Sequence, residues 1–204
     1  MAGSNFGEFI GVSDLHYALI SKDDLTTYQA DAPVYLAPAA SVANAPNVAV
    51  KNRFYDNKAY FTTSTEGETK VTVIISGIDL ETKYKLLGKH YDSTAKRGYD
   101  TGDSSEAPYV ALGFKMDVEG GARYFWYLKG KFAPYAEDAE TKTTDITEKT
   151  TTLEFTAIVT TYSKFQVDGK NKAMKKTEAD NRLDTDVTSE TWFAKVQTPP
   201  LAAA

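Results

Sequence analysis

The side chains that could do chemistry are few in this chain, and their spacing matches no catalytic pattern. His16 and His90 are the two histidines, and cysteine is absent. Neither histidine lies in the H-E-x-x-H spacing that binds zinc on a helix. The sequence also lacks the G-x-S-x-G turn of serine hydrolases, a phosphate-binding loop and the G-x-G-x-x-G pattern of dinucleotide sites. We therefore expect no catalytic, metal-binding or cofactor-binding residues, and a protein that is not an enzyme.

Acidic residues occur in close pairs, a feature that glycosidase active sites and calcium sites also have. A glycosidase needs two carboxylates that face each other across a cleft, and the sequence pattern places no pair in that way. The Asp184-x-Asp186 spacing resembles part of a calcium loop, but the glycine and the closing glutamate are not at the required positions. We interpret the acidic pairs as solvent-exposed turns: Asp23 with Asp24, Glu137 with Asp138, and Asp184 with Asp186.

Composition favours one β-rich domain that spans residues 1–204. Hydrophobic residues make up 42% of the 204-residue chain, which is enough for a single core. Abundant Thr, Tyr and Phe suit a pleated, half-buried surface. The net charge of −5 argues against tight binding of nucleic acid, which usually requires a basic face. Because cysteine is absent and no apolar run approaches about 18 residues, we expect folding in a reducing cytoplasm and no membrane span.

Two runs with strand periodicity, joined by Gly120-Gly121, predict a β-hairpin between residues 107 and 132. Alternating residues of a strand point to opposite faces of its sheet. The second run, RYFWYLKGKF, carries aromatic residues on both faces. A strand with one buried face would not need them, so we expect its other face to contact another copy of the protein. Three residues of this run are candidates for that contact: Arg123, Phe125 and Tyr127.

Residues 37–69 show no clear period and predict a long loop, because prolines and asparagines interrupt them. Loops of more than about 12–15 residues are uncommon unless they are functional or disordered, and disordered segments are usually poor in aromatic residues. Residues 1–11 predict an N-terminal arm, in which Phe9 and Ile10 are further contact candidates. The loop should order against a partner, or fold back on its own core, through four aromatic residues: Phe54, Tyr55, Tyr60 and Phe61.

A short helix should begin after Asp79, a suitable N-cap, and end at Gly88. Leu80, Tyr84 and Leu87 fall at i, i+4 and i+7, so we expect this face to pack on the sheet. The remaining expected elements are an edge strand at 34–36, strands at 15–20, 70–76 and 153–162, and a C-terminal extension, residues 163–204, with a helix near 188–196.

Five segments, in order along about the first 160 residues, resemble one protein family. That family is the major tail tube protein of long-tailed, non-contractile phages that infect Gram-positive bacteria. Residues 163–204 match the family less well, and residues 53–65 depart from its acidic, glycine-containing loop. The segments are FIGVSDLHYALISKDD (9–24), VIISGIDLETKYKLLGKHYD (73–92), APYVALGFK (107–115), RYFWYLKGKF (123–132) and LEFTAI (153–158).

The resemblance implies a mainly β fold: a sandwich or barrel with one short flanking α-helix, a long inter-ring loop at 37–69 and terminal arms. Six copies would form a ring, and rings would stack into a hollow tail tube of the virion, assembled in the cytoplasm of the bacterial host. The implied partners are the tape-measure protein in the lumen, the tail terminator, the distal tail or baseplate proteins, and DNA that passes without specific binding. At −5 per copy, a ring would repel DNA, which is densely charged.

Two rival functions remain open from the sequence. The first is a carbohydrate- or receptor-binding β-sandwich module of a virion, which would expose Trp or Tyr on a concave face and stay monomeric. The second is an enzyme with a metal or carboxylate site, which would need clustered His, Asp or Glu. Electron microscopy of the concentrated protein would separate a tube former from a monomeric module.

Overall fold

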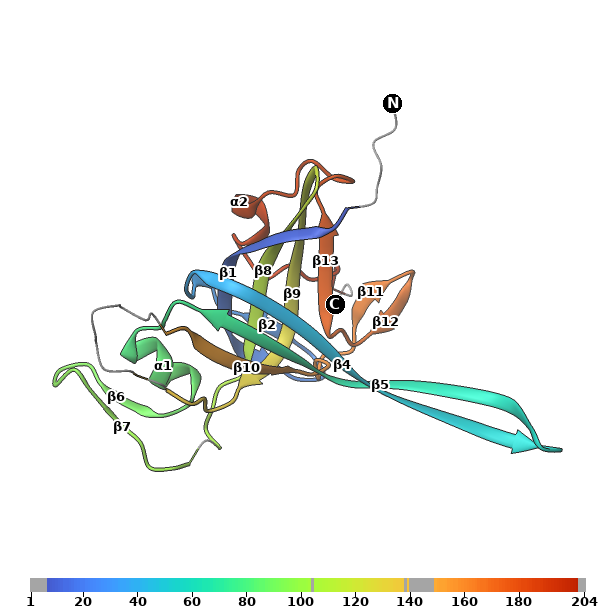
Figure 1. Cartoon of the computed structure of the whole chain (residues 1–204), viewed down its shortest axis with the longest axis horizontal. Coiled ribbons are helices and arrows are strands. Elements are labelled where there is room, and N and C mark those ends of the chain that lie inside the picture. Colours follow the sequence, from blue (N-terminus) through green and yellow to red (C-terminus); the bar gives the residue numbers. More distant parts are fainter. Residues whose placement is uncertain (1–6, 104, 138, 140–148, 202–204) are drawn as a thin grey trace.

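The protein is mainly β, with one large antiparallel sheet of nine strands (Figure 1). The computed structural model describes residues 7–103, 105–137, 139 and 149–201. The main path of the sheet runs β2-β1-β8-β9-β10-β5-β4, while β3 pairs with β1 and β13 pairs with β9. Its strands are β1 (Phe9–Asp23), β2 (Tyr28–Ala30), β3 (Val34–Tyr35), β4 (Ala39–Tyr55), β5 (Lys58–Ile75), β8 (Val110–Val118), β9 (Gly121–Phe132), β10 (Thr151–Ala157) and β13 (Lys176–Asp180).

Small elements surround this sheet. Two hairpins form separate two-stranded sheets, and two short helices lie at opposite ends of the body in Figure 1. These elements are α1 (Leu80–Leu86), β6 (His90–Asp92), β7 (Arg97–Tyr99), β11 (Phe165–Val167), β12 (Lys170–Lys172) and α2 (Ser189–Trp192). The expected helix near residues 188–196 is thus confirmed as α2, which begins after Thr188 as its N-cap.

The predicted central hairpin is confirmed as β8 and β9. Val118 pairs with Gly121, so the two-residue turn consists of Glu119 and Gly120, one residue earlier than Gly120-Gly121. Gly120 has φ of 79°, a conformation that glycine adopts without steric cost. Gly113 lies opposite Trp126, and a Cβ atom there would come within 2.8 Å of the indole ring. The glycine therefore lets the Trp126 ring lie flat against β8.

One face of the sheet holds the main hydrophobic core. Residues from β1, β5, β8, β9 and β10 meet there, together with the end of α1. The period of two predicts the core side of β8 correctly. In β9 it does not, because Phe125 and Tyr127, predicted to contact another copy, lie on this face. Its most completely buried side chains are Leu15, Val71, Val73, Ile75, Val110, Leu112, Phe114 and Phe155.

The opposite face of β8 and β9 is covered by the C-terminal part of the same chain. Tyr124, Trp126 and Leu128 of β9 form a second buried cluster with Trp192 and Phe193 beside α2. Figure 1 shows this C-terminal segment beside β8 and β9. Both faces of β9 are thus buried within the chain, since Phe125 and Tyr127 on its other face lie in the main core, and the prediction that another copy covers one of them is wrong. The apolar residues of 163–204 are few and widely spaced, so the sequence pattern does not predict this covering layer.

Helix α1 begins and ends as predicted. Asp79 Oδ1 accepts a hydrogen bond from the Thr82 backbone N–H at 2.9 Å, and Gly88 has φ of 67°. The predicted packing face is partly wrong, because Leu80 is 44% exposed whereas Leu87 is buried. Tyr84 is half-buried. The helix has seven residues and meets the core through its C-terminal end, so an i, i+4, i+7 stripe does not describe its contact.

Replacing Leu87 by alanine should lower the free energy of unfolding by about 2–5 kcal/mol, because it leaves a cavity in the main core. Leu80→Ala is the matched control, since the same change is made at a side chain that is 44% exposed. Urea titration of both variants would measure the difference. Equal losses in the two variants would contradict the placement of α1.

Residues 37–69 are mostly not a loop, which corrects the sequence prediction. They contribute nearly all of β4 and much of β5, which pair as a long hairpin. The two-residue turn is Asp56-Asn57, and both residues have positive φ, 49° and 61°. Such values are typical of a type I′ hairpin turn. The alternation is weak because most of this hairpin is exposed, and Pro46 is tolerated on the edge strand β4.

The N-terminal arm predicted at residues 1–11 is shorter than expected. Residues 1–6 lie outside the described part of the chain, and β1 begins at Phe9. Phe9 pairs with Val118 of β8. The predicted edge strand at 34–36 is confirmed as β3, and the strands at 15–20 and 70–76 are confirmed in β1 and in β5, which ends at Ile75. The strand predicted at 153–162 is correct only to Ala157, where β10 ends, because the chain then leaves the sheet and the Thr161 and Tyr162 amides donate to Asp23.

Candidate functional site

The outer part of the β4–β5 hairpin, residues 48–66, projects from the body, and we call it the arm (Figure 1). Strand β10 pairs with β5 from Ile75 to Thr69 and no further. Among the described residues, the arm strands therefore pair with each other alone. An isolated two-stranded hairpin is marginally stable, and its unpaired edges attract further strands. The arm is consequently the part of this fold that most needs a partner.

Both faces of the arm carry exposed apolar side chains. Val48, Val50 and Phe54 alternate along one face of β4, and Phe54 is 65% exposed. Near the turn, Arg53 pairs with Phe61 and Phe54 with Ala59, so Tyr60 is an extra, bulged residue. Side chains that are apolar on both faces suit a ribbon inserted between two surfaces.

The other face of the arm is an aromatic cluster of Tyr55, Tyr60 and Phe61. Their ring centroids lie 6.0–6.4 Å apart in edge-on or tilted arrangements. Tyr60 is 65% exposed even with these contacts. Large aromatic residues dominate the energetics of protein interfaces because they bury much area with few rotatable bonds. Of the four aromatic residues predicted from the sequence, three form this cluster near the end of the arm, and Phe54 lies on the other face.

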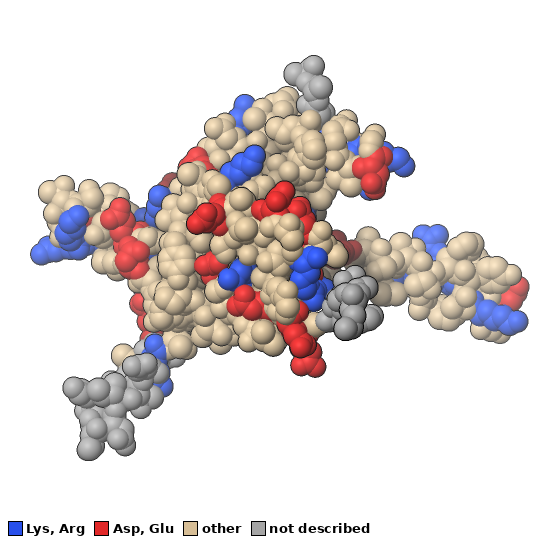
Figure 2. Space-filling view, turned by 90° about the horizontal axis from the view of Figure 1, so that it is seen from above, with Lys and Arg blue, Asp and Glu red and all other residues tan. Residues whose placement is uncertain are grey.

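Charge separates the arm from the body. Residues 51–58 contain Lys51, Arg53 and Lys58 against one acid, Asp56, and so carry +2. Glu66 brings the whole arm (48–66) to +1, so the remainder of the chain, whose total is −5, carries −6. Figure 2 shows the arm at the right, mostly uncharged along its length, with charged residues gathered near its end. The end of one arm is thus complementary in charge to the body of another copy.

The contact candidates outside the arm divide into two groups. Phe9 and Ile10 are exposed, as expected, and the Arg123 guanidinium lies 5.6 Å from the Phe9 ring centroid. Arg123 also pairs with Asp180 through Nε and Oδ2 at 3.1 Å. Phe125 and Tyr127, however, are buried in the main core of their own chain. Their prediction as surface contacts is therefore wrong, whereas the Arg123 side chain is 42% exposed and stays a candidate.

A buried ion pair between Asp23 and Lys129 joins the two halves of the fold, which corrects the prediction that Asp23 lies in an exposed turn. The two side chains are 4% and 8% exposed, and Nζ lies 2.5 Å from Oδ2. Asp23 also accepts backbone hydrogen bonds at 2.8 Å from Thr161 and Tyr162, where the chain leaves β10. Lys129 donates to Thr161 Oγ1 at 2.8 Å. These bonds fix the start of the C-terminal segment.

This network lowers the pKa of Asp23. Burial alone raises the pKa of the carboxyl group, but the hydrogen bonds from Lys129 and from the Thr161 and Tyr162 amides outweigh burial, so the pKa lies below its ordinary value of 3.8. The ionised carboxylate therefore contributes stability above about pH 3.8, and this contribution is lost as the pH falls through the lower, folded-state pKa.

Replacing Asp23 by asparagine should lower the free energy of unfolding at pH 7 by about 2–3 kcal/mol, since charge-assisted hydrogen bonds are lost and Lys129 stays buried. The difference between wild type and variant should shrink as the pH falls below about 3.8. Urea titrations from pH 2.5 to 7 would measure it, with the exposed Asp31→Asn as the control. A constant difference across this range would contradict a role for the charge.

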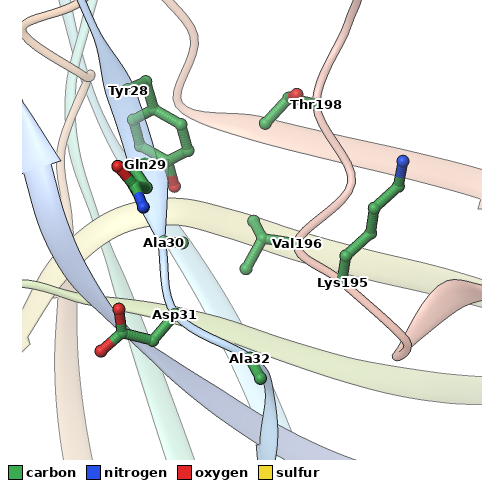
Figure 3. A pocket seen from close by; sticks show the side chains of 8 residues that line it. All are labelled: Tyr28, Gln29, Ala30, Asp31, Ala32, Lys195, Val196 and Thr198. Atoms are coloured by element: carbon green, nitrogen blue, oxygen red, sulfur yellow. The ribbon is translucent and has the colours of Figure 1, made fainter.

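The clefts of the body do not gather reactive groups. A cleft of about 290 Å³ lies between β2 and the C-terminal segment. In Figure 3 its two charged side chains, Asp31 and Lys195, point in different directions and do not converge. Across the described ranges, no three His, Cys, Asp or Glu side chains lie close enough to hold a metal ion. No helix in those ranges is long and apolar enough to cross a membrane.

Comparison with known proteins adds no relative. No protein-family model matches this chain, and a search of curated proteins gives no match. The function therefore has to be inferred from the arm, its charge and the sequence resemblance.

Proposed function

We propose that this protein is a structural subunit of a phage tail tube, in which six copies form a ring and rings stack through their arms. The observation that carries this proposal is the arm itself, which projects from the body with apolar side chains on both faces and unpaired edges. A monomer leaves these groups in water, whereas a stack of rings gives each arm a binding surface. The five sequence segments that resemble the tail tube family point in the same direction.

In this proposal the nine-stranded sheet and its C-terminal layer act as a sandwich, flanked by α1. The inter-ring loop expected from the sequence becomes a hairpin, and its tip at +2 lies against a body at −6 in the adjacent ring. Six equal contacts join each pair of rings, so a modest contact per copy gives a durable joint. Lateral contact through the second face of β9 is not part of the proposal, because the C-terminal segment covers that face.

The remaining partners follow from the tube. Its lumen encloses the tape-measure protein and later conducts DNA, and its two ends bind the tail terminator and the distal tail or baseplate proteins. The acidic balance of each copy opposes adhesion of DNA to the wall, because DNA phosphates bind basic surfaces. No membrane takes part.

Electron microscopy and sedimentation of the purified protein over a wide range of concentrations would test the proposal. Rings or tubes at high concentration support it, and high salt should weaken them because the arm and the body carry opposite charges. A protein that remains monomeric at every concentration would overturn it. That outcome would favour the alternative, a carbohydrate- or receptor-binding module of a virion, for which glycan arrays are the next measurement.

A further inference from the structure

We propose that Lys175 sets the direction in which the arm leaves the body, by tying the base of the arm to the central strand β9. Lys175 lies in the C-terminal segment, just before β13, and far from the arm in sequence. It is a positioning residue, because it acts through the arm and not through contact with a partner. The importance of this direction for assembly rests on the proposed function. The contacts of Lys175 with the base of the arm are independent of that function.

The base of the arm contains a bulge. Pro46 pairs with Thr69, and the next pair is Val48 with Glu66, so two residues of β5 stand opposite one residue of β4. Thr69 is also the last residue of β5 that pairs with β10. A bulge bends a strand and locally disrupts its ladder of hydrogen bonds. The bulge therefore marks the point where the supported sheet ends and the unsupported arm begins.

Lys175 is held by β9 through its backbone and reaches the bulge at the base of the arm through its side chain. Its backbone oxygen accepts a hydrogen bond from the Leu128 N–H of β9 at 2.9 Å. Its ammonium group donates to the Gly67 carbonyl oxygen at 3.1 Å and also pairs with the Glu66 carboxylate. Gly67 lies within the bulge, and Glu66 belongs to the first pair beyond it. Lys175 thus connects the core strand, through its backbone, to the bulge and to the first pair beyond it, through its side chain.

The surroundings leave room for the arm to move without this connection. A cleft of about 140 Å³ lies beside the bulge, lined by residues of β4, β5, β9 and β13 together with Lys175. Lys175 is 14% exposed in its side chain, whereas its partner Glu66 is 56% exposed. A ribbon bound to nothing else would bend into this open space. The hydrogen bond from Lys175 to the Gly67 carbonyl oxygen should restrain the arm most, because it holds the backbone of β5 directly. Water replaces this bond less easily, since the Lys175 side chain is 14% exposed.

Lys175 should therefore affect the direction of the arm much more than the free energy of folding. A partly exposed ion pair adds little to the free energy of folding. Loss of Lys175 should therefore widen the range of arm directions and leave the body folded. In a stack of rings, an arm that points in many directions loses conformational entropy when it docks, so assembly requires a higher protein concentration.

Spin labels on the monomer would test this directly, and the absence of cysteine means that no native thiol has to be removed. One label goes on the arm at Ser64→Cys and one on the β8–β9 turn at Glu119→Cys, both exposed positions. Pulsed electron spin resonance then gives the distribution of the distance between them. Lys175→Met should widen this distribution by about a factor of two, because the bulge is then free to bend.

Two further variants keep the result interpretable. Lys172→Met removes an exposed lysine of β12 and should leave the distribution narrow. Lys175→Arg keeps a donor and should stay close to wild type. The melting temperature of Lys175→Met should fall by no more than about 4 °C. An unchanged width in Lys175→Met would overturn the inference, and this holds whether or not the wild-type protein forms tubes, which is decided separately by microscopy.

Discussion

Replacing Tyr60 and Phe61 by serine should raise the protein concentration required for tube formation by about three to six orders of magnitude. Buried aromatic anchors at interfaces are worth about 2–4 kcal/mol each when truncated, and each 1.4 kcal/mol corresponds to a factor of about ten. The two side chains belong to the aromatic cluster at the end of the arm and bury little in their own chain. The monomer should therefore keep its melting temperature while assembly is lost.

Sedimentation velocity and electron microscopy of the double variant would measure this effect. Tyr99→Ser is the matched control, since Tyr99 is an exposed aromatic residue on β7, at the end of the molecule away from the arm (Figure 1). It should assemble like wild type. Tubes that form at the wild-type concentration in the double variant would show that the arm does not join the rings. A large drop in melting temperature would show instead that the arm is part of the fold.

Replacing Trp126 by alanine should lower the free energy of unfolding by about 3–5 kcal/mol, or about 6–20 °C in melting temperature. Trp126 is completely buried, and its Nε1 donates to the Trp192 carbonyl oxygen at 3.3 Å. Its ring also meets Phe193 edge-on, with centroids 5.7 Å apart. The change therefore removes both a large apolar contact and a hydrogen bond between the sheet and the C-terminal segment.

Hydrogen exchange would locate this loss. Amides of residues 160–196 should exchange faster in Trp126→Ala, because this segment covers the face from which the indole is removed. Leu183→Ala is the control, as Leu183 is 73% exposed and should change neither stability nor exchange. If Trp126→Ala costs less than about 1 kcal/mol, the C-terminal segment does not cover this face in solution.

Sequence patterns predicted the parts of the fold in which burial and periodicity agree. The hairpin of β8 and β9, the strand β10 and the caps of α1 were all readable, because each rests on local rules of alternation or capping. The arm was not readable as strand. Its outer half buries nothing in its own chain, so no face is marked as apolar, and the aromatic residues at its end were recognised without their strand.

Contacts between distant segments explain the other errors. Nothing near Asp23 in the sequence indicates that it pairs with Lys129, and β9 holds two lysines, Lys129 and Lys131, of which the sequence does not show that Lys129 is the buried one. In the same way, alternation shows that both faces of β9 are apolar but not which face meets the main core. Phe125 and Tyr127 lie in that core, while the C-terminal segment covers the face with Tyr124, Trp126 and Leu128. Lys175 has no sequence signal at all, since both of its arm contacts lie more than 100 residues away.

The exposure of the arm also bears on how such a protein evolves. Because the side chains of residues 48–66 support no core of their own, substitutions among them leave the subunit folded and change only what it binds. Selection on this segment then acts through the surface that it binds on another copy of the protein. The arm and that surface can therefore change together. Related proteins can in this way acquire arms that bind copies of the same protein and do not bind its relatives, while the sheet keeps its structure.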